Sequence, residues 1–216
     1  MTPDFATAVD PVFLNVLRIL TRIRNGNPPT PDEARSEARN LIAEAEGRVG
    51  QRRDWELAKY ALVAWIDEML IDSPWDGQSW WKENSLEVEI FRSRERATQF
   101  FENAKEASTL TRRDALEVYY VCVMLAFRGL YRGEDAAFLA DQLELPPTLG
   151  AWVQQAARSI ELTQSRPAIN YTPQPGAGAP PLDGKFVMVG ASLMTLVLLA
   201  AVGLLAWLFL WSAETS

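Results

Sequence analysis

Apolar residues recur at spacings of three and four along residues 1–165, and the alternation typical of strands is almost absent. The run over residues 9–23 predicts an amphipathic helix that ends at Asn25-Gly26. A second helix is predicted from Thr30, where a capping residue precedes a proline, and a third runs from after Asp54 to about residue 71. Further helices are expected near residues 85–91, 96–108 and 149–160.

The most apolar helix of this region is predicted over residues 115–127, in which Glu117 is the only charged side chain. This segment is too short to cross a membrane. A helix that is apolar on all faces is typical of the centre of a bundle. We therefore expect an all-α fold for residues 1–165, with short connections between the helices.

Residues 186–211 contain no charged side chain, and as a helix they would reach about 39 Å at ~1.5 Å per residue. A hydrocarbon core is roughly 30 Å thick, so we predict one C-terminal transmembrane helix over residues 185–211. Lys185, Trp207 and Trp211 are expected at the two membrane interfaces. All Lys and Arg residues lie at or before Lys185, which predicts that the N-terminal domain is cytoplasmic and that residues 212–216 lie outside.

Residues 166–184 contain five prolines and three glycines, a composition that cannot build a packed core. We expect a linker between the helical domain and the membrane. The first ten residues have neither the basic nor the apolar region of a signal peptide. The predicted organisation is a domain over 1–165, a linker over 166–184, an anchor over 185–211 and a tail over 212–216.

Composition excludes several classes of chemistry. The chain has no histidine, which excludes Ser-His-Asp and Cys-His catalysis and histidine metal sites. Its single cysteine, Cys122, lies in an apolar run and is expected to be a buried hydrophobic residue. The net charge of −7 argues against nucleic-acid binding, and no glycine-rich phosphate loop is present. We expect no catalytic residue, no metal and no cofactor.

Asp67 and Glu68 are adjacent carboxylates on an otherwise apolar helix, where their side chains point about 100° apart. At least one must approach the apolar side, and a buried carboxylate is costly unless it is paired. Three interpretations are open: internal pairing, a docking site for another protein, and general acid–base catalysis, for which the spacing offers no partner. Glu117 raises the same question on its own helix.

Trp75, Trp80 and Trp81 lie close together beside Pro74 and Gly77. Most tryptophans pack in the core, although tryptophan is also common among binding hot spots. The three rings therefore predict either core packing or an exposed anchor for a partner.

Four segments, taken together and in this order, resemble the DotU family, which includes TssL of type VI secretion and IcmH/DotU of type IVB secretion. They are YALVAWIDEMLIDSPW (60–75), SLEVEIF (85–91), QFFE (99–102) and LEVYYVCVMLAFRGLYRG (116–133). On this resemblance, Asp67 and Glu68 fall on the family's acidic pair. Other signature positions are Trp75, Glu117, Tyr119, Tyr120, Phe127, Arg128, Gly129 and Tyr131.

The resemblance implies a cytoplasmic domain of two helical bundles forming a hook, anchored in the inner membrane of a Gram-negative bacterium. It implies a role without catalysis, in which the protein joins an IcmF/TssM-like partner and docks TssK-like baseplate proteins, often as a homodimer. It makes Asp67 and Glu68 candidates for partner contact. The stretch over 134–152 departs from the family's usual basic, proline-rich ending. A type IVB subunit and a free tail-anchored adaptor are the alternatives.

Overall fold

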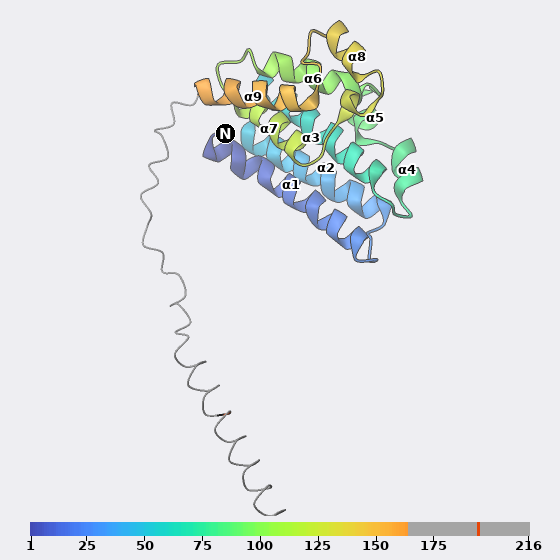
Figure 1. Cartoon of the computed structure of the whole chain (residues 1–216). Helices are drawn as coiled ribbons and strands as arrows, with labels where there is room; N and C mark the ends of the chain where they lie inside the picture. Colours follow the sequence, from blue (N-terminus) through green and yellow to red (C-terminus); the bar gives the residue numbers. More distant parts are fainter. Residues whose placement is uncertain (164–193, 195–216) are drawn as a thin grey trace, which may run out of the picture. The chain divides into compact units, whose positions relative to one another are not determined.

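The computed structural model describes residues 1–163 and Met194 (Figure 1). The predicted linker over 166–184, the interface residues Lys185, Trp207 and Trp211, and the tail over 212–216 lie outside the described residues. Among the residues that are described, no helix has both the length and the apolar character needed to cross a membrane.

Residues 1–163 fold into helices without a strand, which confirms the predicted all-α class. The description as two bundles forming a hook stays a prediction. The α-helices are α1 (Pro3–Arg24), α2 (Pro31–Val49), α3 (Arg53–Asp72), α4 (Gln78–Glu83), α5 (Leu86–Phe91), α6 (Arg96–Ala107), α7 (Asp114–Met124), α8 (Ala136–Gln142) and α9 (Leu149–Thr163), with a 3₁₀ helix, η1 (Gly129–Arg132), before α8.

The first two helices form an antiparallel hairpin, visible in blue in Figure 1. The turn between them uses Gly26 at a φ of +73°, a conformation that glycine adopts without a steric cost. Thr30 and Glu33 then form a reciprocal capping box, as the sequence of the second helix start favours. Within the hairpin, the side-chain amide of Asn15 donates to Glu37 at 2.8 Å.

The centre of the domain is shared by α3 and α7. The helix α3 is buried around its whole circumference, and α7 packs along it. Two polar contacts fix this pairing: the Tyr119 hydroxyl donates to the Leu57 carbonyl at 2.7 Å, and the Trp65 indole donates to the Leu125 carbonyl at 3.1 Å. The helix predicted over 115–127 lies at the centre of the domain as expected, but it is not buried on every face, because Met124 is 59% exposed.

The end of α7 also differs from the prediction. The helix stops at Met124, and Ala126 adopts a φ of +78°. The Phe127 N–H bonds back to the Cys122 carbonyl at 3.0 Å, in the pattern by which a left-handed residue terminates a helix. Phe127, which follows this turn, is fully buried in the core.

Phe127 belongs to an aromatic cluster that joins α6, α7, η1 and α9. Phe100 stacks on Phe127 with ring centroids 3.9 Å apart and meets Tyr119 edge-on at 4.7 Å. Phe101 meets Tyr131 at 4.9 Å and Trp152 at 5.3 Å, both nearly perpendicular. Such offset and perpendicular arrangements are favoured by the ring quadrupole. The cluster ties the C-terminal helix α9 to the rest of the core.

We expect Phe100→Ala to lower the free energy of unfolding by about 3–5 kcal/mol, since it removes a fully buried ring from the middle of this cluster. Leu162→Ala, at a side chain that is 88% exposed, is the matched control and should change it by less than about 0.5 kcal/mol. Denaturant unfolding followed by tryptophan fluorescence measures both. Equal effects of the two substitutions would contradict the cluster's role.

Candidate functional site

The acidic pair lies on the innermost helix, and the two side chains leave α3 on different sides. Asp67 is 0% exposed and Glu68 is 6% exposed. Asp67 faces the segment that carries α4 and α5, whereas Glu68 faces η1. The geometry matches the divergence expected for adjacent helical residues, so the two carboxylates form two sites.

Asp67 binds three donors from the segment after α3. One carboxylate oxygen accepts from the Trp81 indole and from the Leu86 N–H, each at 2.9 Å, and the other accepts from the Glu87 N–H at 2.8 Å. The two amides open α5, so the carboxylate satisfies N–H groups that have no partner inside that helix. Burial away from water raises the pKa of Asp67 to about 6, although the three donors act in the opposite direction.

Glu68 makes an equivalent arrangement with η1. It accepts from the Arg128 N–H at 2.7 Å and the Gly129 N–H at 3.2 Å, and the Arg132 guanidinium lies 3.1 Å away. Arg132 also pairs with Asp72. Burial raises the pKa of Glu68, and the nearby N–H groups and Arg132 oppose that shift. Both acids are therefore bonded internally, and Asp67 presents no surface to a partner.

The three tryptophans form a contiguous cluster, but they differ in exposure. Trp81 is fully buried, with its ring centroid 6.3 Å from that of Trp80 and 6.5 Å from that of Trp75. Trp75 and Trp80 are half-buried, and the Arg35 guanidinium lies 5.6 Å from the Trp80 ring centroid. The core-packing interpretation describes Trp81. Partner contact stays a prediction for Trp75 and Trp80.

The signature aromatic residues serve the core. Tyr119 and Phe127 are fully buried, and the Tyr131 hydroxyl donates to the Pro146 carbonyl at 2.6 Å. Tyr120 is half-buried on the outer side of α7. Arg128 contributes its backbone N–H to Glu68, as described above.

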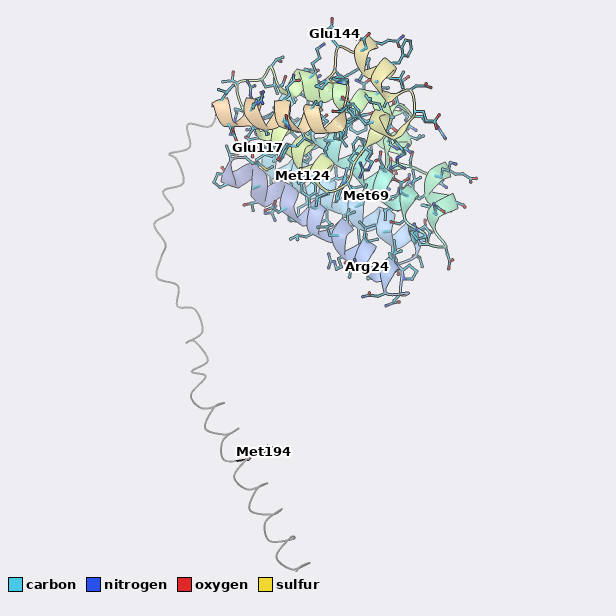
Figure 2. The ribbon with its side chains drawn as sticks, viewed as in Figure 1. Arg24, Met69, Glu117, Met124, Glu144 and Met194 are labelled. Atoms are coloured by element: carbon cyan, nitrogen blue, oxygen red, sulfur yellow. The ribbon has the colours of Figure 1, made fainter. Side chains whose placement is uncertain are left out.

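Glu117 forms an ion pair with the α-amino group of Met1, and Figure 2 shows it on the part of α7 near the start of α1. Cys122 is buried, and its thiol lies 3.7 Å from the Ala61 carbonyl. Burial raises the pKa of this thiol well above its ordinary value, so it is not a thiolate nucleophile at neutral pH. Over the described residues, no three His, Cys, Asp or Glu side chains are grouped to hold a metal.

Glu87 is a buried acid that the sequence did not single out. It is 0% exposed and accepts from the Tyr60 hydroxyl at 2.8 Å, and the Arg96 guanidinium lies 3.8 Å from its other oxygen. In the sequence, Glu87 and Glu89 alternate with apolar residues in the same way. No local signal separates the buried one from the half-exposed one.

The comparisons with known proteins bear on this arrangement. The family model described as "Type VI secretion system protein DotU" matches residues 5–213. The chain belongs to the DotU family. Among solved structures, the cytoplasmic domain of TssL from Acinetobacter baumannii is similar, with a TM-score of 0.57 and 25% identity, over 73% of this chain and 98% of that one. The comparison with curated proteins found no match.

Membership of the DotU family confirms the resemblance drawn from the four segments. The family is one of structural secretion subunits and is not known as an enzyme family. In this DotU-family chain, the acidic pair holds α5 and η1 against α3.

The raised pKa of Asp67 gives a pH signature. Because its pKa in the folded protein, about 6, exceeds the ordinary value of 3.8, the folded state holds the proton more tightly than the unfolded state. The free energy of unfolding should therefore fall as pH rises from about 4 to 6, by at most about 1.4 kcal/mol per pH unit, and then level off. Asp67→Asn should remove this component, as measured by denaturant unfolding at several pH values. Parallel pH profiles for the two proteins would contradict the assignment.

Both the backbone conformation and the neighbouring atoms disfavour a side chain at position 129. Its φ is +50°, and a Cβ there would lie 2.9 Å from the Ala97 carbonyl oxygen and 2.9 Å from the Phe127 ring. Gly129→Ala should lower the free energy of unfolding by about 2 kcal/mol or more, from overpacking and a disfavoured φ. Gly47→Ala, inside α2 with open space around it, should raise the free energy of unfolding by about 0.5–1 kcal/mol. Thermal unfolding of both variants measures the contrast, and a tolerated Gly129→Ala would argue against this packing.

Proposed function

We propose that the chain is a non-catalytic structural subunit of the type VI secretion membrane complex. The observation that carries the proposal is the family match over residues 5–213, which extends across the uncharged run of 186–211 as well as the helical domain. In this proposal the 185–211 segment anchors the protein in the bacterial inner membrane. The domain over 1–165 is cytoplasmic, and residues 212–216 are periplasmic.

Within the complex, the proposed partners are an IcmF/TssM-like inner-membrane protein and TssK-like baseplate proteins, with a second copy of the chain forming a homodimer. The similarity to a TssL cytoplasmic domain supports a binding role for the helical domain. The bilayer is the remaining partner. No nucleic acid is involved, in keeping with the net charge of −7.

The internal bonding of the acidic pair divides the site residues into two roles. Asp67 and Glu68 act as positioning residues, since their oxygens are occupied by donors from α5 and η1. Trp75 and Trp80 are the proposed direct contacts, because each keeps part of its ring at the surface beside the buried Trp81. Large half-exposed aromatic rings are typical anchors of protein interfaces.

Two alternatives remain, one from the same class of secretion subunit and one from another class. A type IVB DotU/IcmH subunit would share the fold and the anchor, and the description of the matching family names type VI. A free tail-anchored adaptor would share the membrane attachment but would bind no IcmF-like protein. Co-purification with the apparatus therefore separates the adaptor from the secretion subunit.

The membrane assignment is tested in the native host by fractionation and chemical crosslinking. The full chain should sediment with the inner membrane and recover an IcmF-like protein, and deletion of residues 185–211 should move it to the soluble fraction. A full-length chain that stays soluble, or that recovers no IcmF-like protein, would overturn the proposal.

The contact role of the tryptophans is tested in the same pull-down. Trp80→Ala should reduce recovery of the TssK-like protein about tenfold or more, because the ring is the proposed partner contact, while membrane sedimentation is unchanged, because the proposed anchor lies in residues 185–211. Lys82→Ala, an exposed residue on the same helix, is the control and should leave recovery unaltered. Unchanged recovery with Trp80→Ala would remove Trp80 from the proposed interface.

A further inference from the structure

The short helix α8 carries an aromatic side chain that is exposed to solvent. Phe138 is 64% exposed, whereas every other aromatic side chain of residues 1–163 is buried or half-buried. Single exposed apolar residues are common on proteins. Phe138 differs from such a residue in two respects: its helix is packed against the domain, and its neighbours on the surface are acidic.

Phe138 is held outward by the packing of its own helix. On the opposite side of α8, Ala140 is fully buried, and Leu143 packs against the core. The Leu145 N–H bonds to the Ala140 carbonyl at 2.8 Å and closes the helix. The inner side of α8 lies on η1, and Figure 1 shows α8 at the edge of the domain. The ring is therefore presented by an ordered element.

Acidic side chains surround this ring. Asp135 and Asp141 lie three residues before and after Phe138, which places them beside it on the same face of the helix. Glu134 is exposed next to them, and within residues 1–163 none of the three carboxylates forms an ion pair. Glu144, which Figure 2 labels near α8, pairs with Lys105 at 2.5 Å. The segment 133–145 contains four acidic residues and no Lys or Arg.

The combination defines the partner's chemistry. An exposed ring gains most when it enters an apolar pocket that excludes water, and the acids around it require Lys or Arg on the rim of that pocket. Anionic lipid headgroups and nucleic acids are disfavoured by the same charge. A second copy placed symmetrically on this face would bring like charges together, which disfavours self-association here.

We infer that the outer face of α8, residues 134–141 with Phe138 at its centre, docks a protein that carries an apolar pocket rimmed by Lys and Arg. The inference rests on the proposed function in one respect: the docking partner is another subunit of the secretion apparatus. It adds a second contact surface, distinct from the one carried by Trp75 and Trp80.

The first test places a photoreactive benzoylphenylalanine at position 138 of the full-length chain in the native host. Irradiation should crosslink it to one apparatus subunit, through a peptide that contains or adjoins Lys and Arg residues. The same group at position 14, where Leu14 is 65% exposed on α1, is the control site. No crosslink above that control, a crosslink to a second copy of the chain, or a crosslinked peptide without basic residues would overturn the inference.

The second test uses the crosslinked subunit, purified, as the probe for binding to the full-length chain in detergent. Phe138→Ala and the pair Asp135→Lys/Asp141→Lys should each weaken the affinity at least tenfold, and the charge-reversed pair should also lose the salt dependence of the wild type. Leu14→Ala and Asp4→Lys/Asp10→Lys match them in exposure and charge change on α1 and should stay within twofold. Equal losses in the test and control variants would overturn the inference.

Failure here and failure of the proposed function give different results. The proposal gives Phe138 no role in membrane attachment or in binding the IcmF-like protein, so the Phe138→Ala variant should still sediment with the inner membrane and recover the IcmF-like protein. If it does so while binding the probe normally, the α8 surface is wrong and the proposed function stands. If the wild-type chain itself recovers no IcmF-like protein, the proposed function fails independently of Phe138.

Discussion

The burial of two adjacent carboxylates on α3 is the constraint on which the arrangement of the shorter elements depends. A buried carboxylate without donors is strongly destabilising, and so is a buried N–H without an acceptor. Asp67 and Glu68 resolve both problems at once, because each accepts from the opening amides of a short helix. With six residues in α5 and four in η1, neither helix would be stable alone. Their positions are therefore determined by the long helix beneath them.

The two surfaces proposed for docking are each connected to one of these acids. Asp67 also binds the Trp81 indole, and Trp81 lies directly beneath Trp75 and Trp80. Glu68 holds η1, and η1 in turn packs against α8, which presents Phe138. The two acids, of which Asp67 is fully buried and Glu68 is 6% exposed, thus hold the elements next to both proposed surfaces.

Periodicity and capping signals predicted the long helices well. Thr30-Pro31 begins α2 as expected, and most apolar positions over residues 9–23 face the core, although Leu14 and Leu17 are exposed. The 115–127 helix was predicted too long, because its apolar run continues past Met124 and contains no glycine or proline to mark the end. After the stop, Phe127 packs against Phe100 and Phe101, which lie outside this run in the sequence.

By itself, the sequence determined the all-α class, the core faces of the long helices, and the need to satisfy an acid on an apolar helix. Each of these follows from residues within a few turns of one another. Only the tertiary structure decided that both acids are buried, that Glu87 is buried while Glu89 is half-exposed, and that Phe138 faces solvent. The burial of the acidic pair depends on donors distant in the sequence: the Leu86 N–H that reaches Asp67 lies 19 residues away, and the Gly129 N–H that reaches Glu68 lies 61 residues away. A local sequence pattern predicts a helix and its apolar face, but it does not predict which distant element packs against that helix.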